Sequence, residues 1–365
     1  MQDGQHIRQL TSLRFFAAFW VVAFHYWPKL AAPGTPGLVE KGYLGVELFF
    51  VLSGFILSHV YRSSVEEGRF NYGSFLWARL ARVYPLHLAT LIGMGLLAGA
   101  AMAAGFNIDP NILSWRALPA NLLLLQAWGF APVAGWNHPS WSISAEWFAY
   151  LTFPLFAWAA LKLKERPVVA LVAAAAFLVW LNLAFEALAG FPLTQATIAW
   201  GALRIVPCFA YGCALHAFWT ARPAKDRRAA LALTALSISG VIAAAAVGAP
   251  DPVLVIGLGI VILALGRLAQ TGSNLLGQAP FVYLGEISYS VYMVCVPWKI
   301  VFVNSAAKLF QLSDERLPLG LWLVFLIGVV PLAAASYHLI EKPARSRMKL
   351  MAEAWETRRP AAARA

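Results

Sequence analysis

The chain has 365 residues, of which 60% are hydrophobic, 13% aromatic and only 12% charged. A soluble domain carries about 25% charged residues, so the composition excludes a soluble globular protein. The formal net charge of +11 comes from basic residues between apolar segments. This pattern indicates membrane topology first and attraction to anionic lipid or an anionic cofactor second; no basic stripe on a soluble module indicates a nucleic-acid partner.

Apolar segments recur from end to end, and a helix that spans a bilayer needs about 20 such residues. We expect ten spans, near residues 9–28, 42–61, 83–104, 141–162, 167–187, 197–220, 229–248, 252–270, 285–304 and 318–340. The apolar stretch 118–130 is shorter and contains a proline, so we interpret it as re-entrant or interfacial. The predicted fold is an all-α, polytopic transmembrane helical bundle.

The segments that connect these spans differ in their content of basic residues. Four connections are rich in Lys and Arg: 62–82, 162–166, 222–228 and 342–349. Three others are nearly free of positive charge: 188–196, 249–252 and 305–317. The positive-inside rule places both termini in the cytoplasm if ten spans are counted, whereas an eleventh span over 118–130 would put basic loops outside.

The domain organisation expected from this pattern is simple. Residues 1–348 form a single transmembrane domain, and residues 349–365 form a disordered cytoplasmic tail. We see no internal repeat and no cleavable signal peptide, because no small-residue cleavage site follows Arg8 and Arg14. The three cysteines lie inside apolar segments and show neither a disulfide framework nor a metal-binding spacing, so we expect no metal: Cys208, Cys213 and Cys295.

Four ionisable residues are expected at membrane depth, where charge is expensive and usually functional. Arg14 lies near the cytoplasmic end of the first span, and His25 lies about 16 Å farther along the helix axis, near the outer leaflet. Glu47 and Glu146 are assigned a depth similar to that of His25. A carboxylate orients an imidazole and favours its protonated form, so this layer suits proton transfer.

Each of these residues also has a simpler interpretation. Arg14 can snorkel to the interface, His25 can be a packing residue, and Glu47 can pair with His25 for structural reasons. Glu146 can merely mark the start of a helix.

Further polar and aromatic residues stand at the ends of the expected spans. Trp141 can be an interfacial belt residue and Ser142 a cap, while Trp27 and Trp136 near the outer face either anchor there or stack on sugar rings. Arg79 and Arg82 either anchor the third span or bind phosphate by bidentate hydrogen bonds.

Seven sequence blocks together resemble the integral-membrane acyltransferase-3 family, in the family's order and over nearly the whole chain. They are Arg14-x10-His25, GYLGVELFFVLSGFIL (42–57), RLARVYPLH (79–87), PSWSISAEWFAY (139–150), RIVPCFAYG (204–212), LGEISYSVYM (284–293) and YHLIEKPAR (337–345). The resemblance implies transfer of an acyl group, commonly acetyl from acetyl-CoA, to hydroxyls of sugars, polysaccharides, peptidoglycan, lipids or antibiotics. Many members act on cell-surface glycans.

The resemblance also assigns residues. It makes Arg14 and His25 the signature pair, with His25 the catalytic histidine. Motif positions without an assigned role include Glu47, Arg79, Arg82, Ser142, Glu146, Tyr289, Tyr292 and Glu341. One departure is Cys295, because members often carry a histidine there. Some members also have a C-terminal soluble esterase-like domain; we expect this chain to complete transfer alone or with a partner.

The resulting hypothesis is a membrane O-acyltransferase with no permanently bound cofactor and with acyl-CoA, chiefly acetyl-CoA, as the donor. The donor phosphates would dock on basic residues at the inner face: Arg14, Arg79, Arg82, Lys342 and Arg345. His25 would act as general base, with Glu47 or Glu146 holding its tautomer. Direct transfer and an acyl-histidine intermediate both remain open, whereas no local signal places a base beside Ser142.

The expected setting is a bacterial cytoplasmic (inner) membrane that the protein crosses many times. The acceptor would be a cell-surface or exported polysaccharide or its lipid-linked precursor, with membrane lipid and polysaccharide biosynthesis or export machinery as partners. The main alternative is a proton-coupled transporter of a sugar or organic acid, which membrane carboxylates and a histidine would also suit. A membrane glycosyltransferase or flippase is a weaker alternative, because those proteins generally need an acidic metal-binding or nucleotide-sugar motif and this sequence shows no such cluster.

Overall fold

The computed structural model describes residues 6–105, 108–312 and 315–358, and over these residues it contains helices and two isolated β-bridges but no β-strand. Twelve helices have ten or more residues. They are α1 (Arg8–Tyr26), α3 (Gly45–Glu66), α4 (Tyr72–Ala103), α6 (Trp141–Leu151), α7 (Phe153–Lys162), α8 (Pro167–Ala189), α9 (Gly201–Ala221), α10 (Arg227–Ala246), α11 (Asp251–Gln270), α13 (Ser288–Phe310), α14 (Leu319–Ser336) and α15 (Lys342–Arg358). Shorter α-helices are α2 (Gly37–Glu40), α5 (Leu118–Leu122) and α12 (Ala279–Glu286).

Within the described residues, eight helical stretches are long and apolar enough to cross a membrane. They coincide with eight of the ten expected spans and confirm a multi-pass helical bundle. The other two expected spans are also helical. In α1 the polar residues of the first two turns lower the mean hydropathy, and the span expected at 141–162 is divided at Thr152 into α6 and α7, with Pro154 in the first turn of α7.

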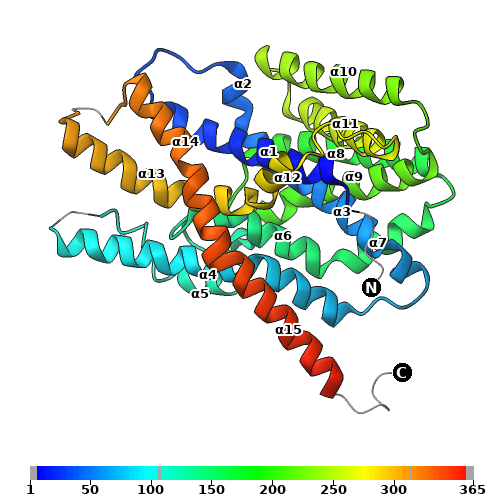
Figure 1. Ribbon diagram of the computed structural model, residues 1–365, viewed down its shortest axis with the longest axis horizontal. Coiled ribbons are helices and arrows are strands. Elements are labelled where there is room, and N and C mark those ends of the chain that lie inside the picture. The colour runs from blue at the N-terminus through cyan, green and yellow to red at the C-terminus, as the bar shows by residue number, and fades with distance from the viewer. Residues whose placement is uncertain (1–5, 106–107, 313–314, 359–365) are drawn as a thin grey trace.

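The centre of the bundle is built on α3 and α9, which are mostly buried, whereas α8 and α10 expose most of their length. Figure 1 shows α10 at the upper edge of the molecule and α15 projecting from its lower right. The two central helices touch backbone to backbone at glycines. A Cβ on Gly54 would lie 2.1 Å from the carbonyl oxygen of Phe209, and one on Gly212 would lie 2.0 Å from that of Val51. Small residues at a crossing permit this close approach in membrane helices.

The start of α1 and the helix α15 lie at the same end of the bundle. Gln9 Nε2 donates to the carbonyl oxygen of Ser273, just after α11, over 2.6 Å. Trp77 at the start of α4 donates to the carbonyl oxygen of Met348 in α15 over 2.8 Å, and His6 and Arg345 line one cavity. The two described ends of the chain therefore lie at the same end of the bundle, as the basic connections predicted for the termini.

Two other segments for which the sequence made a prediction are residues 118–130 and the C-terminal tail. Residues 118–130 form α5 and a single π-helical turn, η3 (Gln126–Phe130), both too short to span a membrane. The tail expected to be disordered from residue 349 instead continues α15 to Arg358, and residues 359–365 lie outside the described chain. The helix persists because Met, Lys, Leu, Ala and Glu, which fill the stretch MKLMAEA, are all strong helix formers.

Candidate active site

A cavity of about 390 Å³ lies between α1, α3, α4, α6, the junction of α12 and α13, and the turn that leads into α15. Seven charged side chains line it: Arg14, Arg79, Arg82, Arg345, Glu146, Glu286 and Glu341. The structure thus brings together the four arginines among the five basic residues that the sequence grouped as donor ligands. Lys342, the fifth, is not among the lining residues.

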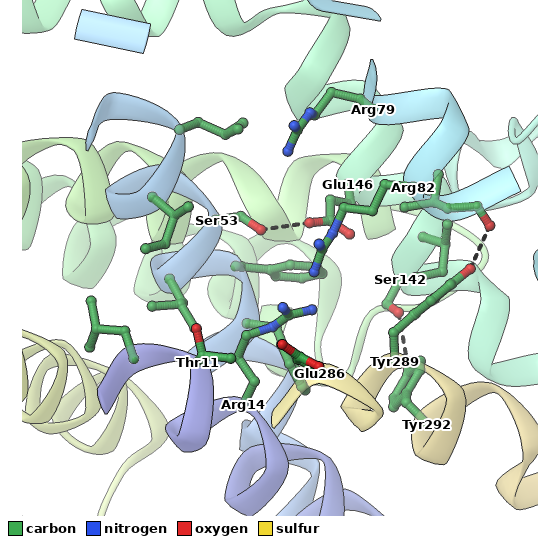
Figure 2. A pocket seen from close by; sticks show the side chains of 18 of the residues that line it. Thr11, Arg14, Ser53, Arg79, Arg82, Ser142, Glu146, Glu286, Tyr289 and Tyr292 are labelled. Carbon is green, nitrogen blue, oxygen red and sulfur yellow. Dashed lines mark hydrogen bonds between the residues drawn. The ribbon is translucent and has the colours of Figure 1, made fainter. Parts of the chain in front are cut away.

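The arginines offer hydrogen-bond donors that the protein leaves largely unused. Arg14, Arg82 and Arg345 make no hydrogen bond or salt bridge to another residue in the described part of the chain, and the buried Nε of Arg79 has no partner. Figure 2 shows the guanidinium groups of Arg14 and Arg82 pointing into the same space, flanked by Glu146 and Glu286. Arginines arranged in this way suit a phosphorylated ligand, because a guanidinium binds phosphate through paired N–H donors.

Local sequence explains how these arginines converge. Arg79 and Arg82 are three residues apart on α4, so they share one helix face. Arg79 Nη2 donates to the Tyr61 hydroxyl over 3.4 Å, and the guanidinium carbon lies 5.7 Å from the centre of the Tyr61 ring. Because Tyr61 belongs to the last turns of α3, this contact fixes Arg79 at that end of α3.

The carboxylates of the cavity are held by hydroxyl groups. Ser53 Oγ donates to Glu146 Oε1 over 2.6 Å, and Ser290 Oγ donates to Glu341 Oε2 over 2.9 Å. Four arginines against three glutamates leave a formal excess of one positive charge in the lining. An anionic ligand is therefore favoured over a cationic one.

The cavity is elongated and changes character along α3. Its lining on this helix runs from Leu57 to Val46, eleven residues, or about 16 Å along the axis. Arg79, next to Tyr61, marks the basic end. At the other end the lining comes from apolar or weakly polar side chains: Val46, Phe49, Phe50, Ser142, Ile143 and Tyr292. A long ligand with an anionic head and a thin, less polar arm matches this gradient.

His25 lies outside this lining, beyond the apolar end of the cavity. Lys299 Nζ donates to its carbonyl oxygen over 3.3 Å, and the neighbouring Tyr26 donates to the carbonyl oxygen of Cys295 over 2.7 Å. His138 and Lys299 are the titratable side chains that act on the imidazole electrostatically. Burial lowers the pKa of His138, which lies in the turn before α6, so His138 is neutral at pH 7.

Glu47 has a different partner from the one expected. Its buried carboxylate accepts a hydrogen bond from Arg204 Nε in a salt bridge, and no hydrogen bond joins it to His25 in the described structure. Arg204 also donates to the carbonyl oxygen of Ala196 over 2.8 Å, and its guanidinium carbon lies 4.6 Å from the centre of the Trp141 ring. Helix position gave the depth of Glu47 but not the helix that its side chain faces.

Glu146 lies at a different depth from Glu47. It is bonded to Ser53, which is six residues, or about 9 Å, farther along α3 than Glu47. The prediction of one layer that contains both carboxylates and His25 is therefore wrong. Glu146 belongs with Arg14 and Arg82 at the cavity.

The remaining motif positions have defined contacts. Trp141 is buried, so it is not an interfacial belt residue. Tyr289 donates to the carbonyl oxygen of Val83 over 2.6 Å, and the Tyr292 hydroxyl donates to that of Pro139 over 3.0 Å. Ser142 Oγ donates to the Tyr292 hydroxyl over 2.9 Å, and the buried Cys295 Sγ donates to the carbonyl oxygen of Tyr292 over 3.1 Å.

Several residues in or near the site were not singled out from the sequence. Ser53, Tyr150 and Glu286 line the cavity, and the others contact or act on motif residues: Arg204, His138 and Lys299. Ser53, Tyr150, Arg204 and Glu286 lie inside the blocks that carried the family resemblance, but nothing in those blocks distinguished them from their neighbours. Lys299 stands in an otherwise apolar stretch seven residues after Tyr292, which was a sign of a polar environment.

Similarity to known proteins identifies the family of this chain. Residues 7–338 match the family model described as the acyltransferase domain, Acyl_transf_3. The chain belongs to this family. The resemblance inferred from the sequence blocks is thus confirmed, and this acyltransferase is a multi-pass membrane protein.

Two relatives carry related names. Acyltransferase MdmB of Streptomyces mycarofaciens is 35% identical over 155 residues, which cover 40% of this chain and 38% of that protein. O-acetyltransferase OatA of Staphylococcus aureus (strain NCTC 8325 / PS 47) is 24% identical over 374 residues, which cover 95% of this chain and 58% of that protein. The matches therefore span less than two thirds of the length of these relatives. No solved structure matches the chain.

Proposed function

We propose that this acyltransferase transfers an acyl group, acetyl in the first place, from cytoplasmic acyl-CoA to a hydroxyl of a cell-surface or exported polysaccharide or its lipid-linked precursor. The observation that carries the proposal is the elongated cavity, with its cluster of arginines at one end and an apolar lining at the other. Family membership and the names of the two relatives support acyl transfer.

The donor would enter from the end of the bundle where α1 begins and α15 lies. Its phosphates would bind the guanidinium groups of Arg14, Arg79 and Arg82, with Arg345 as a further ligand. Glu146 and Glu286 would restrain Arg14 and Arg82 so that these side chains are ordered before the donor arrives. The pantetheine arm would follow α3 toward Val46 and bring the thioester to the apolar end.

His25 would then act as general base. An imidazole nitrogen accepts the proton of the acceptor hydroxyl while the hydroxyl oxygen attacks the thioester carbonyl. The carbon–sulfur bond breaks as the carbon–oxygen bond forms, and the departing CoA thiolate takes the proton back from the imidazolium. Glu47 has no catalytic part in this proposal because its carboxylate forms a salt bridge with Arg204.

The test is release of free CoA thiol from acetyl-CoA by purified protein, with a bacterial envelope extract as the source of acceptor. We expect extract-dependent release to fall by at least about a hundredfold in His25→Ala, the effect of losing a general base. CoA binding should remain, because His25 lies outside the donor cavity. Equal release by both proteins would reject His25, and failure of the wild-type protein to bind CoA would reject the donor site.

A further inference from the structure

The apolar end of the donor cavity is lined on the side of α13 by a hydrogen-bonded wall made of Tyr292, Ser142 and Pro139. Tyr292 of α13 donates to the carbonyl oxygen of Pro139 over 3.0 Å. Ser142 Oγ lies 2.9 Å from the Tyr292 hydroxyl and 3.1 Å from the Pro139 carbonyl oxygen, and either of these can accept its single proton. The centre of the Tyr292 ring lies 6.4 Å from that of Phe49, edge to face. All three wall residues are buried: Tyr292, Ser142 and Pro139.

The turn that carries Pro139 is itself tied to α13. Asn137 Nδ2 donates to the carbonyl oxygen of Met293 over 3.0 Å, so both Tyr292 and its neighbour hold the segment 137–140. Hydrogen bonds at two consecutive residues of α13 therefore hold this wall in place.

His25 is level with a part of α13 that lies beyond Tyr292. Along α13, Tyr292 is followed by Cys295, which contacts Tyr26, and then by Lys299, which contacts His25. The seven residues from Tyr292 to Lys299 correspond to about 10 Å along the helix. His138, which acts on the imidazole, is the residue next to Pro139 in the wall. The wall therefore lies at the apolar end of the donor cavity, on the side of the candidate base.

This placement has a consequence for the acyl group. A donor whose phosphates bind the arginines directs its acyl end toward Tyr292, and a thioester carbonyl must come within about 3.5 Å of the attacking oxygen. Every carbon beyond the carbonyl then has to fit between the thioester and the wall. Because buried, hydrogen-bonded side chains yield little, inserting extra methylenes there is unfavourable.

The geometry points to Tyr292 as the residue that limits the donor to short acyl groups, an inference that rests on the proposed donor site. Truncating the ring would enlarge the apolar end of the cavity and admit longer chains. The hydroxyl is secondary, because Phe at this position keeps the ring in place while Ser142 still bonds Pro139.

The experiment measures the dissociation constants of CoA, acetyl-CoA and octanoyl-CoA for the full chain in detergent, by competition with labelled CoA. In the wild type we expect octanoyl-CoA to bind at least about tenfold more weakly than acetyl-CoA. In Tyr292→Ala that gap should close to within about twofold, while Tyr292→Phe keeps it. Tyr292→Leu serves in place of Tyr292→Ala if the latter does not fold.

The matched control is Tyr289→Ala, which removes a tyrosine one turn away that lines the same cavity beside the arginines. It should change the affinity for all three ligands by similar factors and leave the gap between acetyl-CoA and octanoyl-CoA in place. An equal gap in Tyr292→Ala and the wild type, or no gap in the wild type while CoA binds, would overturn the role of Tyr292 and leave the donor site standing. Absence of CoA binding in the wild type would instead overturn the donor site.

Discussion

Arg204 and Glu47 form a buried ion pair that joins two helices of the bundle, α9 and α3. Both residues are buried, and the second carboxylate oxygen of Glu47 has no hydrogen-bond partner in the described structure. A buried ion pair adds little net stability compared with apolar residues, but loss of one partner leaves an uncompensated charge. We therefore interpret this pair as a structural clamp between α3 and α9.

Removing only one member of the pair should be more damaging than removing both. We expect Glu47→Gln to lower the free energy of unfolding by about 3–5 kcal/mol, whereas Glu47→Leu combined with Arg204→Met recovers more than half of that loss. The measurement is unfolding in mixed micelles with increasing SDS. Glu66→Gln, which breaks the more exposed pair with Arg62, should change stability by less than about 1 kcal/mol. A double variant no more stable than Glu47→Gln would contradict the clamp.

The unpaired arginines lead to a second prediction at this scale. Arg14→Ala should weaken CoA binding by about 10- to 150-fold, because a charge-assisted hydrogen bond contributes about 1.5–3 kcal/mol. Arg62→Ala is the control, since Arg62 pairs with Glu66 on the surface and does not line the cavity. Binding measured by competition with labelled CoA should also weaken as salt rises. Equal affinities for both variants would remove Arg14 from the donor site.

At the scale of the elements, the position of the cavity depends on how closely α3 approaches α9. Their glycine contact brings the two backbones together, and α3 in turn carries Ser53, which holds Glu146, and the apolar lining from Val46 to Phe50. A change in the separation of these helices would therefore move the carboxylate relative to the arginines of α1 and α4.

A methyl group at this contact should separate the helices. We expect Gly212→Ala to destabilise the protein by about 1–3 kcal/mol through overpacking, although Ala is the better helix former. Gly93→Ala in α4 is the matched control, because nothing lies within 4 Å of a Cβ at that position. It should leave stability unchanged or raise it by up to about 1 kcal/mol. Unfolding in SDS distinguishes the two, and a neutral Gly212→Ala would mean that the contact adapts.

For the whole molecule, the distribution of charge and the fold agree. The basic connections and the described chain ends share one end of the bundle, and the arginine cavity is lined from that end by His6 and Arg345. At the opposite end, Lys29 pairs with Glu315 over 2.5 Å and Lys41 pairs with Asp251 over 2.6 Å. The connections at the first end are the ones rich in Lys and Arg, as the positive-inside rule expects of an inner face.

This orientation can be tested by labelling in intact cells with a membrane-impermeant maleimide. Glu315→Cys should react, and Lys164→Cys should react only after the membrane is permeabilised, because the two exposed positions lie at opposite ends. The natural cysteines at 208, 213 and 295 are buried and give little background. Labelling of Lys164→Cys alone in intact cells would invert the topology.

The sequence alone was enough to predict a helical membrane bundle, the positions of most spans, the family and the grouping of Arg14 with Arg79 and Arg82. The family follows from the resemblance of the seven sequence blocks. The other features depend on local hydropathy, on helical periodicity and on charge in short connections, all of which can be read along the chain. The tertiary structure alone decided that Glu47 pairs with Arg204, that Glu146 lies with the arginines, and that Tyr292 lines the apolar end of the cavity. Such pairings depend on the rotation of each helix about its own axis and on where helices cross. A bilayer accepts many rotations of an apolar helix, and contacts between side chains select one of them.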